Sequence, residues 1–190
     1  MITRTLKRVA IIGGSGAGKT TLGKELAKRI DGVFVEVDAI QHKANWEKAT
    51  GEEIRDATYA ALEGQDRWVI DGTREREVGD YISSRADIIV WLDLALIAKL
   101  IRLVRRSWKR VRNREILWNG NFETWRNVVV GWDSVLGHPL RTHFARRRMV
   151  LAREDHQKIV RLRSAREVAV WLSTLVPEEF RPQANLLRRN

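Results

Sequence analysis

Residues 13–20 carry the residue types that bind a polyphosphate, in the spacing G-x-x-x-x-G-K-T. Glycines let a backbone wrap closely around phosphate oxygens, and successive N–H groups at the start of a helix attract an anion. In such a loop the lysine reaches the β- and γ-phosphates, and the hydroxyl residue holds Mg²⁺. We therefore predict a site for ATP and Mg²⁺ formed by Gly13, Gly14, Ser15, Gly16, Ala17, Gly18, Lys19, Thr20 and Thr21.

Three apolar runs that resemble strands end in aspartate, at Asp38, Asp71 and Asp93. Ligands of open α/β sheets gather outside the carboxyl ends of the strands. A bound triphosphate needs a carboxylate near the metal, and phosphoryl transfer can need a base for the acceptor. We expect Thr20 and Asp71 to support Mg²⁺ and Asp38 to contact the acceptor. Asp93 is an alternative metal support or a helix cap, and Asp71 could instead cap a following helix.

Basic residues are concentrated in one stretch, since residues 99–114 contain eight of them and no acidic residue. Planar guanidinium groups suit the charge that spreads over phosphate oxygens during transfer, and an arginine-rich flap can also exclude water. The segment 105–114 lies immediately before the long insertion, where such a flap would hinge. A nucleotide acceptor would need arginines on its own side of the site, and Arg55, Arg74 and Arg76 could serve.

The alternation of apolar runs and helical patterns predicts an α/β fold, with a parallel sheet covered by helices on both faces. We expect strands over residues 8–12, 33–37, 67–70, 87–92 and 158–162. Helices are expected over residues 21–30, 52–62, 75–83, 94–111 and 165–175. Residues 114–155 form a long insertion, in which we expect a helix over 122–136 that ends before His138 and Pro139.

The chain has 190 residues, no cysteine and a formal net charge of +11. Its length suits one domain, and disulfides and thiolate metal sites are excluded. No apolar run approaches a membrane span, and the first residues lack a signal-peptide pattern. We therefore expect a cytoplasmic protein without a membrane partner, as a monomer or a homodimer. The positive charge favours a polyanionic partner, or only a solvated basic face.

The loop at 13–20, Asp38, the run Asp71-Gly72-Thr73-Arg74 and the arginine-rich insertion together resemble the adenylate-kinase and shikimate-kinase superfamily. The run 67–72, with Asp38 and Trp46, is more similar to a bacterial topology-modulation, or adenylate-kinase-like, branch. The resemblance implies a five-stranded P-loop sheet, or CORE, over 1–38, 65–113 and 156–176. It also implies an acceptor-binding segment at 39–64 and a helical, arginine-rich LID at 114–155, within one domain at 1–176 that a tail at 177–190 follows. It places Arg163 near the adenine, and it places Arg106 and Arg110 in the zone of the LID arginines, where we expect them to be catalytic. We also expect Gly72, Arg55, Arg74 and Arg76 to lie near the acceptor.

Three functions remain open. The leading hypothesis is an ATP-dependent kinase of a small acceptor, most simply a nucleotide. Because Asp38 is typical of kinases of small hydroxylated acceptors, a metabolite kinase with Asp38 as base is the first alternative. The second is a nucleic-acid-binding ATPase or regulator that uses the basic, tryptophan-rich insertion. Against it, the spacing of Trp118, Trp125 and Trp132 predicts one helical face and therefore a packing seam.

Overall fold

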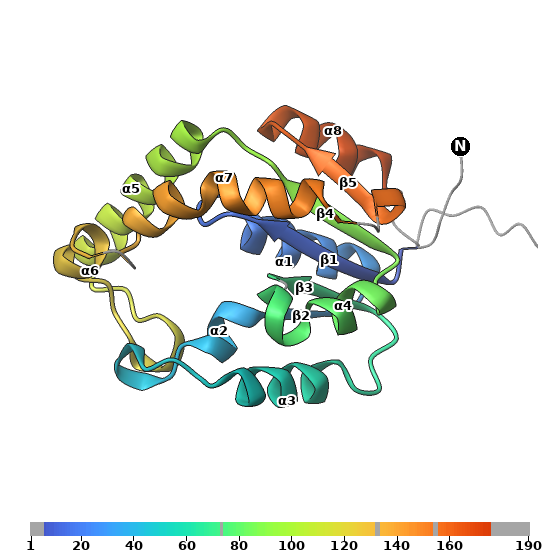
Figure 1. Ribbon diagram of the computed structural model, residues 1–190, viewed down its shortest axis with the longest axis horizontal. Coiled ribbons are helices and arrows are strands. Elements are labelled where there is room, and N and C mark those ends of the chain that lie inside the picture. The colour runs from blue at the N-terminus through green and yellow to red at the C-terminus, as the bar shows by residue number, and fades with distance from the viewer. Residues whose placement is uncertain (1–5, 73, 132–133, 154–155, 176–190) are drawn as a thin grey trace, which may run out of the picture.

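The computed structural model describes residues 6–72, 74–131, 134–153 and 156–175, and within them the chain forms a parallel sheet flanked by helices (Figure 1). The sheet has five strands in the order β2-β3-β1-β4-β5, and all four strand pairs are parallel. The predicted five-stranded α/β fold is confirmed. The strands are β1 (Arg8–Gly13), β2 (Val33–Glu36), β3 (Trp68–Asp71), β4 (Ile88–Leu92) and β5 (Ile159–Leu162).

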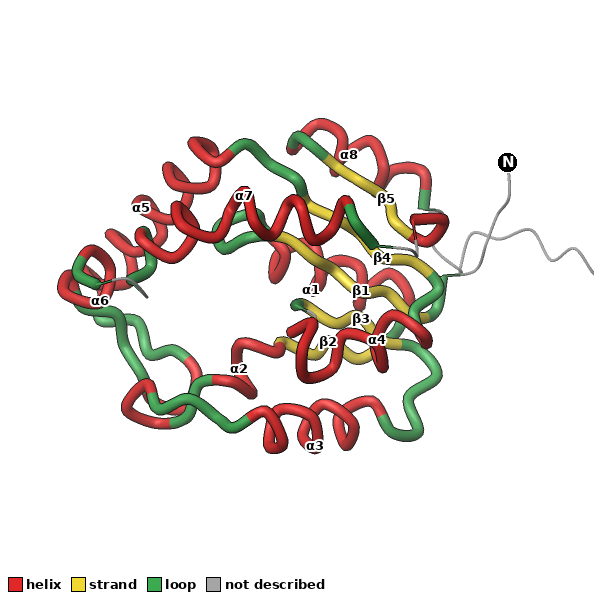
Figure 2. Tube along the Cα trace, viewed as in Figure 1, coloured by secondary structure: helices red, strands yellow, loops and turns green. Residues whose placement is uncertain are grey.

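The central strand β1 is buried on both faces, because successive side chains of a strand point to opposite sides. Val9 and Ile11 enter one core, and Ala10 and Ile12 enter the other. Helices α1 (Lys19–Ile30) and α8 (Ala165–Thr174) pack on the first core. Helices α3 (Gly51–Leu62) and α4 (Asp80–Arg85) pack on the second. Because all the strands are parallel, their carboxyl ends meet at one edge of the sheet (Figure 2).

Local sequence signals explain where the flanking helices begin and which face they bury. In α1 the buried residues Leu22, Leu26 and Ile30 are four apart, which places them on one helical face. Helix α3 begins with a capping box. The Glu53 N–H donates to Thr50 Oγ1 at 3.2 Å, and the Thr50 N–H donates to Glu53 Oε2 at 2.8 Å.

The chain leaves the sheet after β4 through the long helix α5 (Leu96–Asn113) and returns through α7 (Gly137–Leu151), which packs beside α5 (Figure 1). Between these helices lie a single 3₁₀ turn, η3 (Trp118–Gly120), and a short helix, α6 (Trp125–Val129). None of the described helices is long and apolar enough to cross a bilayer. Helices α5 and α7, with the segment between them, therefore form an arm that extends from the strand ends.

Five expectations from the sequence are wrong in detail. Strand β2 ends at Glu36, one residue early, and Asp38 lies in the short helix α2 (Val37–Gln41). The helix expected over 75–83 is a π-helix, η2 (Arg74–Gly79), followed by α4.

The other three differences lie in the insertion. The helix expected over 122–136 is reduced to α6, and Gly131, which follows it, has a φ of 100°. Pro139, which was expected to interrupt the helical pattern, lies in the first turn of α7. A first-turn proline lacks only an N–H that has no partner within the helix. The predicted tryptophan seam does not form, because Trp118 lies in η3 and Trp125 begins α6. Trp132 lies outside the described residues.

Candidate functional site

The glycine-rich loop lies between β1 and α1, and α5 packs directly against it. At Gly16, where φ is 77°, an added Cβ would lie 2.7 Å from the Lys99 backbone oxygen and 2.8 Å from Leu103 Cγ. Only glycine fits there without displacing α5. Arg102 also reaches the loop, since its Nη1 donates to the Ala17 backbone oxygen at 3.2 Å. Helix α5 therefore packs against the outer side of the loop. Helix α1 begins directly after the loop, at Lys19.

The carboxyl ends of β2 and β3 bring two carboxylates to the start of α1. Glu36 and Asp71 are paired in the sheet register. The Thr20 hydroxyl oxygen lies 2.6 Å from Asp71 Oδ2 and 3.0 Å from Glu36 Oε1, and its single proton is donated to one of them at a time. Lys19 Nζ lies 3.3 Å from Asp71 Oδ1. Thr20, Lys19, Asp71 and Glu36 thus form one cluster.

This cluster has the donor chemistry that Mg²⁺ prefers. A hydroxyl oxygen and two carboxylates are hard oxygen ligands, and Mg²⁺ is usually held by one or two carboxylates together with substrate phosphates. Among the described residues no group of three or more histidine, cysteine, aspartate or glutamate side chains could hold a metal alone. Thr20 and Asp71, the two predicted metal residues, therefore fit a metal that arrives with a nucleotide.

The electrostatics of Asp71 are those of a buried carboxylate. Its side chain is 3% exposed, and this burial raises its pKa. The charge of Lys19 and the hydrogen bond from Thr20 act in the opposite direction, and the negative charge of Asp38 adds to the rise. Loss of solvent thus outweighs the local attractions, and an added cation beside Asp71 would offset that cost.

Glu36 was not predicted as a site residue, yet it links the loop to the insertion. One carboxylate oxygen contacts Thr20, and the other accepts the Trp118 indole N–H at 3.1 Å. The sequence signal was a charged residue within an otherwise apolar strand. The sequence pattern instead predicts Asp38, two residues later, as the end of this strand.

Asp93, the alternative metal support, is occupied elsewhere. The Arg161 Nε–H donates to Asp93 Oδ2 at 2.9 Å, and Arg147 Nε lies 3.3 Å from the same oxygen. These two arginines come from β5 and α7, so Asp93 joins the returning arm to the sheet. This pairing favours Asp71 over Asp93 as the carboxylate near the metal.

On the acceptor side, Asp38 lies exposed in α2, within electrostatic reach of Asp71 and Arg106. The pKa of Arg106 is lowered, mainly because surrounding protein removes solvent from its guanidinium and also because of the Arg110 cation. The charges of Glu123, Asp38 and Glu36 act in the opposite direction. Arg110 Nη1 donates to the buried Glu123 Oε1 at 2.7 Å. The two predicted catalytic arginines therefore face acidic groups of the site and of the insertion.

The insertion is joined to the predicted acceptor segment by hydrogen bonds between residues 39–46 and 118–122, which we call the clasp. The buried Asn121 side chain accepts the Trp46 backbone N–H at 2.9 Å and donates to the backbone oxygens of Lys43, at 2.7 Å, and Trp118, at 2.9 Å. Asn119 Nδ2 donates to the His42 backbone oxygen at 2.6 Å. The rings of His42 and Trp118 stack at 5.9 Å. The clasp thus covers one side of Glu36.

The other predicted site residues are spread more widely. Gly72 follows β3 with a φ of 93°, and its N–H donates to the Ile11 backbone oxygen at 3.0 Å. Arg55 on α3 and Arg76 on η2 are exposed, and these two elements contact each other. The side chain of Arg74 lies outside the described part. Arg163 precedes α8, where its N–H donates to Glu167 Oε2 at 2.9 Å. Its contact with a nucleotide stays a prediction.

A second unpredicted group, Lys99, lies against the outside of the loop. Lys99 is 4% exposed, and its Nζ lies 2.8 Å from His143 Nδ1 on α7. An added Cβ at Gly14 would lie 3.1 Å from the same nitrogen. Burial lowers the pKa of Lys99, and burial and the Lys99 charge lower the pKa of His143. The pair couples the position of α7 to the back of the loop.

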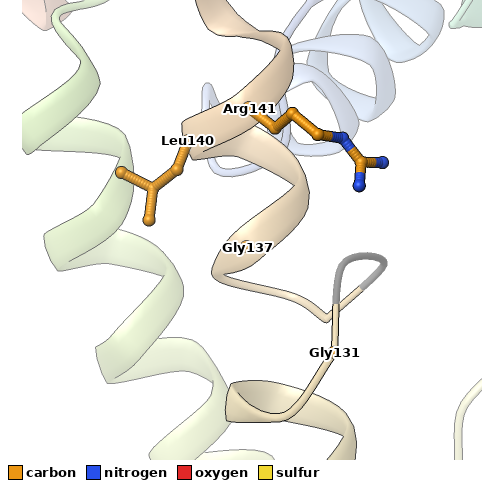
Figure 3. A pocket seen from close by; sticks show the side chains of 4 residues that line it. All are labelled: Gly131, Gly137, Leu140 and Arg141. Carbon is orange, nitrogen blue, oxygen red and sulfur yellow. The ribbon is translucent and has the colours of Figure 1, made fainter.

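A cavity of about 600 Å³ lies elsewhere, within the insertion (Figure 3). It is lined by Gly131, Gly137, Leu140 and Arg141, with Leu140 pointing toward α5 and Arg141 pointing away from it. Among the described residues, none of those predicted to form the site lines this cavity.

The chain matches no protein-family model and no curated protein sequence, but it is similar to solved structures of P-loop kinases. A shikimate kinase from Acinetobacter baumannii, in complex with shikimate, is 19% identical and superposes with a TM-score of 0.53 over 90% of this chain and 92% of that one. A gluconokinase from Sinorhizobium meliloti 1021 is 20% identical, with a TM-score of 0.53 over 90% and 94% of the two chains. A shikimate kinase from Bacteroides thetaiotaomicron is 16% identical, with a TM-score of 0.55 over 90% and 96%. The chain has the fold of these kinases over most of its length.

Proposed function

We propose that the chain is an ATP-dependent kinase that transfers the γ-phosphate to a hydroxyl group of a small metabolite. The single observation that carries this proposal is the cluster of Lys19, Thr20, Glu36 and Asp71 at the ends of three parallel strands, with Asp38 exposed beside it. This arrangement supports a donor site that has a candidate base beside it.

In this mechanism the loop binds and orients ATP, and Lys19 stabilises charge on the transferring phosphoryl group. Bound Mg²⁺, supported by Thr20 and Asp71, would supply further neutralisation of that charge. Asp38 accepts the proton of the attacking acceptor hydroxyl. The oxygen of that hydroxyl bonds to the γ-phosphorus, and the bond from the γ-phosphorus to the leaving ADP oxygen breaks. Arg106 lies close enough to Asp38 for this carboxylate to raise the pKa of Arg106, and the Arg106 cation is suited to the phosphoryl oxygens.

A hydroxylated acceptor is favoured here over a nucleotide acceptor. The sequence alone had favoured the nucleotide. The similar structures are kinases of shikimate and gluconate type, and one of them holds shikimate. In addition, an exposed carboxylate at Asp38 suits a hydroxyl that must lose a proton, whereas a phosphate acceptor would be repelled by Glu36, Asp38 and Asp71.

A nucleotide acceptor remains the second candidate because Arg55 and Arg76 are exposed on α3 and η2, which contact each other. Two exposed cations on adjoining elements are suited to a monophosphate. This arrangement would leave Asp38 without a role as a base, which makes the two candidates separable.

The test is an acceptor screen with γ-labelled ATP that covers shikimate-like acids, aldonates, sugars, nucleosides and nucleoside monophosphates. Asp38→Asn should lower turnover of the accepted hydroxyl compound and leave ATP binding unchanged. Asp80→Asn, which changes an exposed aspartate on α4, is the matched control and should behave like the parent. Labelled product from a monophosphate alone, or equal turnover in Asp38→Asn, would contradict the proposed role.

A further inference from the structure

Helix α5 has an exposed apolar stripe on the side that faces away from the loop. Ile97, Ile101, Val104 and Trp108 are between 47 and 66% exposed, whereas Lys99, Leu103 and Ser107 on the inner face are buried. The stripe residues recur at intervals of three and four, which aligns them along one side of the helix. Scattered exposed apolar residues are ordinary, but a continuous row marks an interaction surface.

The stripe continues onto α6 and is bordered by cations. The rings of Trp108 and Trp125 lie 5.5 Å apart, and Trp125 is itself 47% exposed. Helical geometry places Arg105, Lys109 and Arg112, all exposed, along one border of the stripe. No acidic residue interrupts the sequence between Lys99 and Arg114.

The cations of α5 are divided between two faces. Arg106 and Arg110 are directed to Glu123 and the acidic groups of the site, and Arg102 donates to the phosphate loop. Arg105 and Arg112 lie beside the stripe, on a different side of the helix from Arg106 and Arg110. Lys109 lies 3.8 Å from Glu115. The phosphate site therefore does not require the outer cations.

We propose that this outer face of α5, with Trp125, docks on an anionic lipid surface. A helix with one apolar side, flanking lysine and arginine and an interfacial tryptophan lies in the plane of a bilayer with its apolar side among the acyl chains. Each basic residue near an anionic leaflet adds attraction. A bilayer also needs no groove or matching shape, and α5 lies at the edge of the molecule (Figure 1).

Two other macromolecular partners fit this face less well. Nucleic acid would use the cations but would leave Ile97, Ile101 and Val104 without a role, since phosphates and bases give these side chains little to pack against. A second copy of the chain would bring the same cations together and would be repelled. The chain is thus inferred to bind a membrane peripherally, contrary to the expectation of no membrane partner, which rested on the lack of a spanning segment.

The experiment is co-sedimentation of the full chain with large unilamellar vesicles of phosphatidylcholine, with and without phosphatidylglycerol. Binding is expected to vesicles that contain phosphatidylglycerol and to weaken as salt is raised. Arg105→Gln/Arg112→Gln should weaken partitioning by roughly thirtyfold, because each basic residue contributes about fivefold. Ile101→Ser/Val104→Ser should leave only weak binding that high salt abolishes.

The matched control is Lys24→Gln/Arg166→Gln, which removes the same charge from exposed positions on α1 and α8 and should bind as the parent does. None of the four changed stripe and border residues lies in the phosphate site, so nucleotide binding should be unchanged in every variant. Equal loss in the control, or equal binding to neutral vesicles, would overturn the proposal. Binding of duplex DNA that the Arg105/Arg112 variant loses, with no binding to vesicles, would assign the face to nucleic acid instead.

Discussion

The proposed donor side and the proposed acceptor side of the site are built in different ways. The donor side rests on the sheet, where strand register alone places Glu36 opposite Asp71 and next to the loop. The acceptor side rests on the clasp, in which two irregular segments hold each other through Asn119 and Asn121. Backbone ladders fix the first, and a few side-chain hydrogen bonds fix the second. The donor side should therefore be preformed, and the acceptor side should respond to small changes.

Removal of Lys19 tests the donor side and should have the largest effect. Lys19→Ala should reduce phosphoryl transfer by about a thousandfold, as expected for loss of one pre-positioned charge at the transferring group. The fold should persist, because Asp71 already has a raised pKa and can take up a proton when its partner is lost. Product formation from labelled ATP and circular dichroism measure the two effects. Lys24→Ala, on the exposed side of α1, should change neither; turnover that survives in Lys19→Ala would break the proposed mechanism.

Removal of the candidate base tests whether the two sides act in one reaction. Asp38→Asn should lower kcat by about a hundredfold for a hydroxyl acceptor, in the range expected for general-base catalysis, with little change in the KM for ATP. Steady-state kinetics with each substrate varied in turn give both values. A larger change in the KM for ATP than in kcat would place Asp38 on the donor side and remove the distinction drawn above.

The clasp is tested by Asn121→Ala. This change removes three hydrogen bonds from a buried position and leaves their backbone partners unsatisfied, at a cost of about 1–3 kcal/mol for a buried group. We expect the KM for the acceptor to rise about tenfold, because one tenfold step corresponds to about 1.4 kcal/mol. The affinity for ATP should change little. Asn113→Ala, at the exposed end of α5, is the control, and an equal rise for ATP would mean that the clasp supports both sides.

The smallest effect should come from the contact between α7 and the loop. The pKa of His143 is lowered by burial and by Lys99, so the folded state binds a proton less readily than the unfolded chain. Stability from this contact is present at a pH above the ordinary histidine pKa and is lost as the pH falls below it. Thermal unfolding between pH 7.5 and 5 should show a decline in Tm, part of which His143→Gln removes. A pH dependence of Tm that is the same in His143→Gln as in the parent would show that the pKa of His143 does not differ between the folded and unfolded states.

Much of the donor side could be predicted from the sequence because its signals are local. The loop spacing, the apolar strand runs and the aspartate after residues 67–70 each depend on neighbouring residues. Glu36 was missed because its importance comes from pairing with Asp71, a contact between residues far apart in the chain. The expected strand also ends one residue too late, which predicts Asp38 in place of Glu36 as the carboxylate at the end of the strand.

The insertion was harder to predict because its structure depends on tertiary contacts. The spacing of Trp118 and Trp125 suggested a continuous helix, but Trp118 donates to Glu36 and Trp125 packs on Trp108. Asn119 has a positive φ of 54° in η3, and its side chain binds the acceptor segment. Such conformations are selected by the partner segment rather than by the periodicity of the sequence.

The carboxylate of Glu36 has one further consequence, because its two oxygens serve different halves of the molecule. One contacts the Thr20 hydroxyl and the other accepts the Trp118 indole N–H. A metal that draws Thr20 and Glu36 into its own coordination would alter the strength of the bond to Trp118. Thermodynamic linkage then requires the reverse: an acceptor that stabilises Trp118 in place must change the affinity for the metal-bound nucleotide by the same factor. The two substrates should therefore bind with a measurable and reciprocal cooperativity.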